Sequence, residues 1–555
     1  MRRVPTEEGG EAAAVLFRSA TQRRPSGATT ALALIDGEHY PPVVRAALDR
    51  LGGRHRFVAA LFLGGAEKLR AGGGPRAASM AGEGSPEGQP VAARAGASRG
   101  SDAGGARERL AGELGLPVFF LDELAGGAGR RPAPPESVLP AALLEALRRS
   151  GAGEVVDLSD EPVVGYRERF LLMSAAAAAG VAYIGADFQL RPQPLADIAL
   201  APSLAVVGTG KRVGKTAISG AIARSLAAAG ERVVVIAMGR GGPPEPEVVH
   251  GGDGIGVDEL LCASRRGRHA ASDHFEDAAL AGVTTIGCRR CGGGLAGAAF
   301  DSTVPQALAM LDALAPTMVL LEGSGSVMPP VRAGATVCVA SAAQPLDYIA
   351  GYLGTFRLLV SDVLVLTMCE PPFASAGRVR RLLEHVARAR PDLPVVPTVF
   401  RPRPQTEVCG RRVAYFTTAA PGALRALTTH LTEAYGAEVV LVSGDLARRP
   451  ALAEAVRRAQ AEADVFLTEI KAAAIDVVAE AAAQAGKELV FCDNEPLALP
   501  GADLAAAVDA AVGTARRRHA TAAAEPDASP SREPDARSVA GASPPAKEGR
   551  LRHGR

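Results

Sequence analysis

The sequence lacks any run that approaches the roughly 20 consecutive apolar residues of a membrane-spanning helix. Its first residues contain no hydrophobic signal core. Basic and acidic side chains nearly cancel, 61 against 60, so no overall field marks the chain for nucleic acid or a membrane surface. We therefore expect a soluble, cytoplasmic protein with neither kind of partner, in which any anion-binding site is local.

Cysteine is also scarce: the sequence has seven. Only Cys288 and Cys291 lie close together. This distribution argues against a disulfide framework and predicts reduced thiols. The spacing Cys288-Arg-Arg-Cys291 matches half of a zinc site, but no second ligand pair accompanies it, so we interpret it as structural. Tryptophan is absent, which excludes no class of function.

Composition divides the chain into ordered and low-complexity parts. We expect disorder at residues 1–29, in a Gly/Ala/Ser/Arg tract at 71–108, and in a Pro/Ser/Arg-rich tail at 517–555. Between them, short β-branched runs alternate with Ala/Leu/Arg-rich helical patterns, which is typical of βαβ units and mainly parallel sheets. The fold class predicted is α/β.

Three ordered domains follow from this alternation. We predict an N-terminal α/β domain at 30–195 that carries the tract as an insertion, and a P-loop nucleotide-binding domain with a mainly parallel sheet at 196–405. A C-terminal α/β extension covers 406–516. Whether its strands join the sheet of the second domain stays open.

The strongest motif is the glycine-rich segment Gly208-Thr-Gly-Lys-Arg-Val-Gly-Lys-Thr216, between an expected strand at 204–207 and an expected helix at 215–229. There, backbone N–H groups and the helix dipole can surround phosphate oxygens. Lys215 would neutralise the β- and γ-phosphates of ATP, Thr216 would offer its hydroxyl to Mg²⁺, and Gly214 would let the backbone approach closely. We assign nucleotide binding to the whole loop: Gly208, Thr209, Gly210, Lys211, Arg212, Val213, Gly214, Lys215 and Thr216. The alternative is a tight turn before a helix.

A P-loop needs an acidic partner for its metal ion, and an expected strand at 317–321 is followed directly by Glu322 in Glu322-Gly-Ser-Gly325. We predict Thr216 and Glu322 as the magnesium ligands. Asp253 and Asp258 are weaker candidates. The alternative for Glu322 is a surface glutamate that opens a turn.

Cationic side chains accompany the loop: Lys211 and Arg212 lie in it, Arg240 follows the next expected strand, and Arg289 and Arg290 precede Gly292-Gly-Gly294. Guanidinium groups match phosphate oxygens in a bidentate manner. We predict catalytic roles for Lys211, Arg289 and Arg290 beside Lys215 and Glu322. The alternative for each arginine is a solvated surface charge.

Other candidates depend on weaker signals. Glu38 and His39 follow the first expected strand, a position suited to substrate contacts or to acid/base work. A loop histidine with a purely structural partner is the alternative. For the nucleobase we name Thr367, Met368 and the segment 400–403.

The phosphate loop and Glu322-Gly-Ser-Gly325 are similar to the nucleotide motifs of dethiobiotin synthetase-type P-loop proteins. In those proteins, too, the first glycine of the loop lies one residue earlier than in the common pattern, as Gly208 does here in place of position 209. A closer resemblance, to the cyclic 2,3-diphosphoglycerate synthetase family, covers nearly all of residues 31–512. Besides the acidic motif it is carried by Ile35-Asp-Gly-Glu-His-Tyr-Pro-Pro42, Asp157-Leu-Ser-Asp-Glu-Pro162, Gly165-Tyr-Arg-Glu-Arg169, Tyr183-Ile-Gly-Ala-Asp187, Gly287-Cys-Arg-Arg290, Thr468-Glu-Ile-Lys-Ala-Ala-Ala474 and Asp493-Asn-Glu-Pro496.

This resemblance implies ATP- and Mg²⁺-dependent closure of 2,3-bisphosphoglycerate into an intramolecular phosphoanhydride, with release of ADP and phosphate, by a homodimer. Transfer of the γ-phosphoryl group would form a mixed anhydride that the neighbouring phosphate attacks in place. No protein nucleophile is required. The tract at 71–108 and both terminal extensions depart from the family pattern.

Two other functions remain open at this stage. One is a dethiobiotin synthetase-type ligase or kinase that acts on another anionic small molecule, which could tolerate the loss of Arg289 or Arg290. The other is a partitioning-type regulatory ATPase. Such ATPases place a second lysine early in the loop, where this sequence has Gly210, and Lys211 lies one position later.

Overall fold

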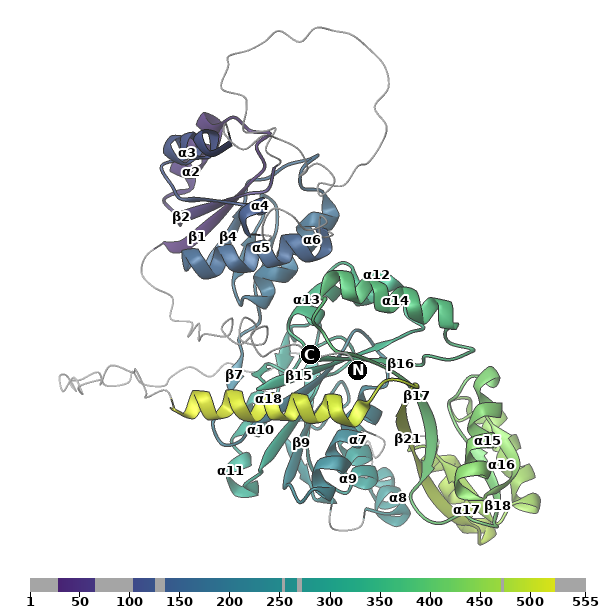
Figure 1. Ribbon diagram of the computed structural model, residues 1–555. Coiled ribbons are helices and arrows are strands. Elements are labelled where there is room, and N and C mark those ends of the chain that lie inside the picture. The colour runs from purple at the N-terminus through teal and green to yellow at the C-terminus, as the bar shows by residue number, and fades with distance from the viewer. Residues whose placement is uncertain are drawn as a thin grey trace, which may run out of the picture.

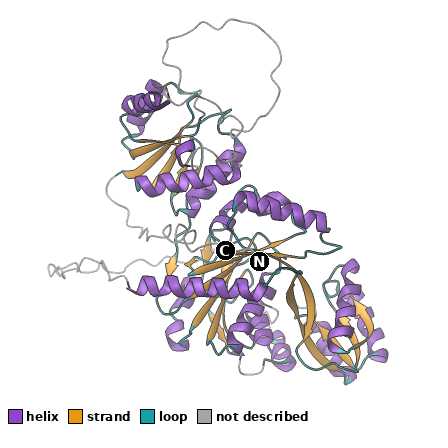
Figure 2. Ribbon diagram, in the orientation of Figure 1, coloured by secondary structure: helices purple, strands orange, loops and turns teal. Residues whose placement is uncertain are grey.

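The computed structural model describes residues 28–64, 103–124, 135–251, 255–266, 272–470 and 474–524. Several segments named above lie outside the described residues: 1–27, most of the tract at 71–108, the tail from 525 and the candidate Asp253. The described residues form two large β-sheets flanked by helices and one two-stranded pair, and the N-terminal sheet stands apart from the larger one (Figures 1 and 2). None of the described helices combines the length and the apolar character needed to cross a bilayer.

The N-terminal sheet has the strand order β3-β2-β1-β4-β5-β6 and is parallel except for β6. Side chains of β1 alternate between two cores: Leu32 and Leu34 pack with helices α5 and α6, whereas Ala33 and Ile35 pack with α2 and α3. Burial on both faces explains why the strand reads as a continuous apolar run. The elements are β1 (Thr29–Ile35), α2 (Pro41–Leu51), β2 (His55–Phe62), α3 (Ala103–Leu114), β3 (Val118–Phe120), α4 (Leu121–Leu124), α5 (Pro135–Ser150), β4 (Glu154–Asp157), α6 (Tyr166–Ala178), β5 (Ala182–Ile184) and β6 (Gln189–Leu190).

The larger sheet has 13 strands in the order β10-β11-β9-β13-β8-β15-β16-β17-β21-β20-β18-β19, with β12 paired to β11. Its strands are β8 (Ser203–Gly208), β9 (Val233–Gly239), β10 (Glu247–Val249), β11 (Thr284–Cys291), β12 (Asp301–Ser302), β13 (Met318–Glu322), β15 (Ala335–Ser341), β16 (Val363–Thr367), β17 (Val395–Pro404), β18 (Arg412–Phe416), β19 (Glu438–Ser443), β20 (Val465–Thr468) and β21 (Glu488–Ala498). A separate pair joins β7 (Ala196–Asp197) to β14 (Val331–Arg332). The C-terminal strands therefore continue the sheet of the P-loop domain, through the antiparallel pair β17 and β21.

Helices cover both faces of the central strands. One apolar core joins them to α7 (Lys215–Ala228) and α18 (Leu504–Ala524), and a second core on the other face includes α14 (Ala376–Ala389) (Figure 1). The remaining helices are α8 (Val257–Arg265), α9 (Asp273–Ala281), α10 (Val304–Leu308), α11 (Leu311–Leu314), α12 (Leu346–Ala350), α13 (Gly354–Leu359), η5 (Pro421–Ala423), α15 (Leu424–Tyr435), α16 (Arg449–Glu462), η6 (Ala474–Ala479) and α17 (Glu480–Ala485).

Two predicted boundaries of the disordered segments are wrong. Helix α3 begins at Ala103, inside the tract at 71–108, because Ala106, Leu110 and Leu114 form a buried stripe at intervals of four residues. Helix α18 continues through the first residues of the expected tail, as far as Ala524.

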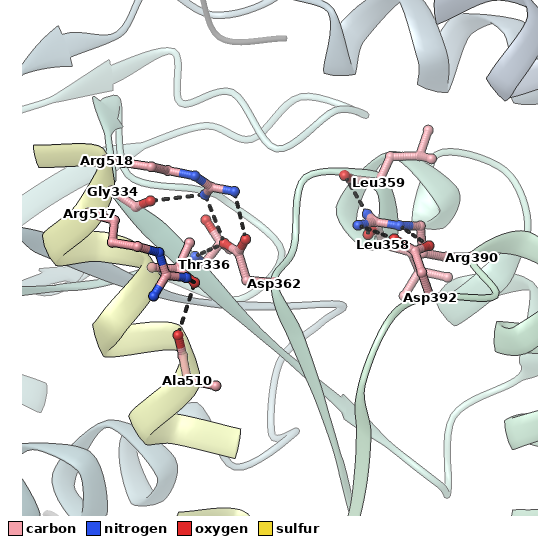
Figure 3. A network of polar contacts seen from close by, with 11 residues as sticks. Gly334, Thr336, Leu358, Leu359, Asp362, Arg390, Asp392, Ala510, Arg517 and Arg518 are labelled. Atoms are coloured by element: carbon pink, nitrogen blue, oxygen red, sulfur yellow. Dashed lines mark hydrogen bonds and ion pairs between the residues drawn. The ribbon is translucent and has the colours of Figure 1, made fainter. Parts of the chain in front are cut away.

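Specific ion pairs hold this last part of α18 on the sheet. Arg518 donates to Asp362 Oδ1 at 2.9 Å and to the Gly334 carbonyl at 2.9 Å, and Asp362 in turn accepts from the Thr336 amide (Figure 3). Composition did not reveal these partners because they lie more than 150 residues away in the sequence.

Candidate nucleotide-binding site

The phosphate loop lies between the end of β8 and the start of α7, at the carboxyl edge of the parallel strands. Lys215 is the first residue of α7 and is only 8% exposed, and its Nζ donates to the Gly210 carbonyl at 3.0 Å. The side chain therefore curls back over the loop. Lys211 and Arg212 remain exposed on its outer side, and Arg212 has a φ of 60°.

Two glycines are required by close contacts. A Cβ atom at Gly208 would lie 2.8 Å from Lys215 Cδ, and one at Gly214, where φ is 93°, would lie 2.4 Å from the ring of Phe400. Both a left-handed backbone and lack of space therefore demand glycine at position 214.

Neighbouring strands fix the loop backbone. Thr367, at the end of β16, donates from Oγ1 to the Val213 carbonyl at 2.8 Å, and Thr209 Oγ1 bonds Gln344 Oε1 at 2.6 Å. Thr367 is fully buried, so the structure places its side chain beneath the loop as a support. Its contact with a nucleobase stays a prediction. Phe400, from the same group of base candidates, packs against Gly214.

Glu322 is the last residue of β13, the strand beside β8, and is 1% exposed. Neither carboxylate oxygen has a well-aligned hydrogen-bond partner among the described residues. Burial, followed by the Asp273 carboxylate, raises the pKa of Glu322 to about 8, while the nearby Thr216 hydroxyl and Lys215 ammonium oppose the rise. The structure thus brings Thr216, Lys215 and Glu322 together, as the sequence predicted for a metal and phosphate site.

The raised pKa of Glu322 has a testable consequence for stability. Between the ordinary value of 4.5 and about 8, the folded state holds a proton that the unfolded chain releases. This contribution to the free energy of unfolding is complete below 4.5 and is lost as the pH rises through about 8. We expect the thermal midpoint of the nucleotide-free wild-type protein to fall more between about pH 6 and about pH 8 than that of Glu322→Gln. Equal slopes in pH-dependent calorimetry would contradict this assignment.

Two carboxylates of the site escaped the sequence analysis. Asp273 and Asp277 lie four residues apart on α9. Asp277 is 3% exposed, and burial, then Glu322 and Asp273, raises its pKa well above the usual range. Their spacing places them on one face of a helix, but only the tertiary structure turns that face toward the loop. The weaker candidate Asp258 lies exposed in the first turn of α8.

The two neighbouring arginines of β11 point in opposite directions, as successive residues of a strand do. Arg290 is 9% exposed and donates to the Ser324 carbonyl at 3.0 Å and the Gly292 carbonyl at 2.6 Å. Arg289 is exposed and donates to the Gly242 carbonyl at 3.2 Å. The structure therefore brings Arg290, but not the Arg289 guanidinium, against the loop that follows Glu322.

A second guanidinium, that of Arg240, lies beside Arg290. A Cβ atom at Gly325 would lie 3.6 Å from Nη2 of both Arg240 and Arg290, so these groups flank the same glycine. Burial and the neighbouring charge of Arg240 lower the pKa of Arg290. Burial also lowers the pKa of Lys215, against the carboxylates of Glu322 and Asp273. Cations at such close quarters favour an anionic ligand with several negative charges.

The remaining candidates lie elsewhere. In the N-terminal domain, the buried Asp36 accepts from the Glu38 amide at 2.9 Å and approaches His39 Nδ1 at 3.3 Å, at the end of β1. Cys288 is buried, which raises its pKa to about 12, whereas Cys291 is exposed. No group of three His, Cys, Asp or Glu side chains in the described part of the chain is arranged to hold a metal ion, and all seven cysteines are free thiols there.

The chain is similar to known proteins in all three of its ordered parts. Models of the three domains of cyclic 2,3-diphosphoglycerate synthetase match: the N-terminal domain at 30–82 and 129–191, the P-loop domain at 203–399 and the C-terminal domain at 404–495. The cyclic 2,3-diphosphoglycerate synthetase of Rubrobacter xylanophilus is 48% identical, over 84% of this chain and 94% of its own length. That of Methanothermobacter thermautotrophicus is 39% identical over 85% and 93%. Among solved structures, LpxK from Aquifex aeolicus in complex with ATP is similar over 59% of this chain and 90% of its own, at 13% identity and a TM-score of 0.32, too low to carry a functional argument.

Proposed function

Because the chain belongs to the cyclic 2,3-diphosphoglycerate synthetase family, we propose that it uses ATP to close 2,3-bisphosphoglycerate into the cyclic phosphoanhydride, releasing ADP and phosphate. It is an ATP-dependent ligase. The observation that carries the proposal is the convergence of the buried Lys215, the buried Glu322 and the guanidinium groups of Arg240 and Arg290 on one phosphate loop.

The phosphate loop holds the nucleotide. Backbone N–H groups from Gly208 to Thr216 and the amino end of α7 face the β- and γ-phosphates, and Lys215 neutralises their charge. The ammonium is already positioned by the Gly210 carbonyl. Its burial makes the electrostatic stabilisation of a developing phosphoryl charge stronger than in water.

The residues present fit a magnesium ion. The two buried carboxylate oxygens of Glu322, which lack a well-aligned partner among the described residues, and the nearby hydroxyl of Thr216 form an oxygen donor set of the kind that Mg²⁺ accepts together with phosphate oxygens. Thr216 and Glu322 would hold the ion, which would supply charge neutralisation at the transferring phosphoryl group.

The bisphosphorylated substrate carries about five negative charges, counting two phosphates and a carboxylate. We assign its neutralisation to Arg290 and Arg240, which flank Gly325, with the exposed Lys211 as a further cation. Holding both substrate phosphates in place would let the second attack the phosphorylated first without diffusion. The chain's own residues neutralise and align, and none acts as a nucleophile.

We also propose the domain boundaries 30–195, 196–405 and 406–516, a cytoplasmic location and a homodimer. The family matches support the boundaries, and the interruption of the N-terminal match between residues 82 and 129 supports an insertion there. Seven free thiols support a reducing compartment. The family resemblance alone supports the homodimer.

Phosphorus NMR tests the reaction directly. Purified protein incubated with ATP, Mg²⁺ and 2,3-bisphosphoglycerate should consume ATP and produce new phosphoanhydride resonances together with ADP and phosphate, and only when all three reactants are present. ATP hydrolysis without new anhydride signals would refute the proposed reaction while leaving nucleotide binding intact.

A further inference from the structure

Asp493 connects the C-terminal part of the sheet to the helix of the phosphate loop. It lies on β21, is 6% exposed, and its Oδ2 bonds the guanidinium of Arg224 on α7. The same oxygen lies 3.8 Å from Nη2 of Arg403. One buried carboxylate therefore compensates two cations, and the assigned chemistry gives it no role.

The face of α7 that meets Asp493 is the one that carries the proposed metal ligand. Thr216, Gly220 and Arg224 recur every four residues and so lie along one side of the helix. Asp493 lines a small cavity together with Thr216 and Gly220. Asp493 thus contacts the third turn of α7 through Arg224, on the helix face that also carries Thr216.

The rest of the antiparallel β17–β21 ribbon supports the same loop. Phe400 of β17 packs against Gly214. Its neighbour Arg401 forms a two-pronged ion pair with Glu370, at 2.5 and 2.8 Å. Glu370 lies three residues beyond Thr367, which bonds the Val213 carbonyl. The ribbon that joins the C-terminal strands to the sheet therefore contacts the phosphate loop both directly and through β16.

We propose that Asp493 is a positioning residue for nucleotide binding: through Arg224 it fixes α7, and with it Lys215 and Thr216, relative to the C-terminal part of the sheet. The inference rests on the proposed nucleotide site. Loss of the carboxylate leaves Arg224 of α7 and Arg403 of β17 as neighbouring cations without their shared counter-charge, which repel each other and push α7 away from the β17–β21 ribbon.

The test measures ATP affinity by calorimetry and steady-state kinetics in the full-length protein with Mg²⁺. Asp493→Asn should weaken ATP binding about tenfold and raise the KM for ATP more than it lowers kcat. Arg224→Gln should have the same effect. The double variant should bind ATP no more weakly than either single variant, because each single change already removes the same Asp493–Arg224 interaction. A merely structural role would lower the thermal midpoint without a selective rise in the KM for ATP.

Asp464→Asn is the matched control, because it breaks an exposed pair with Arg412 of β18, at 2.8 Å, which involves no residue of α7, β17 or β21. It should bind ATP like the wild type. Wild-type ATP affinity in both Asp493→Asn and Arg224→Gln would overturn the inference, and Arg224→Gln alone would do so if Asp493→Asn failed to fold. Lack of ATP binding by the wild-type protein would instead refute the nucleotide site itself.

Discussion

Lys215→Ala should lower kcat by a factor of at least about 100 to 1000 while the protein remains folded. The ammonium is the buried cation of the phosphate loop, so its removal takes away charge compensation where the γ-phosphoryl group is transferred. Burial already lowers the pKa of Lys215, which means that the fold bears a cost for this charge. We therefore expect no large fall in the thermal midpoint.

Turnover is measured as ADP release, and folding as the far-UV circular dichroism and thermal midpoint. Lys487→Ala is the control, since Lys487 lies just before β21 in the C-terminal part, away from the loop. It should turn over at the wild-type rate. Wild-type turnover by Lys215→Ala would refute the assignment of the phosphate loop.

Gly214→Ala should weaken ATP binding by about 100-fold, because a small displacement of the loop misplaces every phosphate contact. The backbone at Gly214 has a φ of 93°, and an added Cβ would lie 2.4 Å from the Phe400 ring. The loop or the ring must move to relieve this contact. Calorimetric titration with ATP and Mg²⁺ measures the loss.

Gly230→Ala provides a control with the same backbone strain. Gly230 follows the other end of α7 with a φ of 87°, but nothing lies within 4 Å of an added Cβ. Both variants should lose about 1–2 kcal/mol of stability from the left-handed conformation, and only Gly214→Ala should also lose ATP affinity. Equal ATP affinities in the two variants would show that the Phe400 contact does not shape the loop.

These predictions share one structural cause. The phosphate loop is not supported by its own strand and helix alone: Thr367 of β16, Phe400 of β17 and Asp493 of β21 reach it or its helix from later parts of the chain. Through Asp493, the C-terminal extension therefore contacts the helix of the phosphate loop, and changes at these three contacts should alter nucleotide affinity.

Local patterns in the sequence were sufficient for the α/β class, the phosphate loop and the carboxylate at Glu322. The alternation of β-branched and helical segments reports the fold class because parallel strands are buried on both faces and must be apolar throughout. Gly214, Lys215 and Thr216 are recognisable because phosphate binding needs a tight turn, a cation and a hydroxyl within a few residues of one another. Glu322 follows a strand, and strand ends of a parallel sheet meet at one edge.

Only the tertiary structure decided which of the remaining candidates share that site. It separated Arg290 from Arg289 because successive strand residues face opposite ways, and it showed that the Thr367 hydroxyl supports the loop backbone. It added Asp273 and Asp277, whose helix face is turned toward Glu322 by packing, and it brought Asp493 to Arg224 across 269 positions of the chain. Contacts of this kind leave no periodic trace in the sequence, because burial and pairing between distant segments are set by how the sheet is assembled.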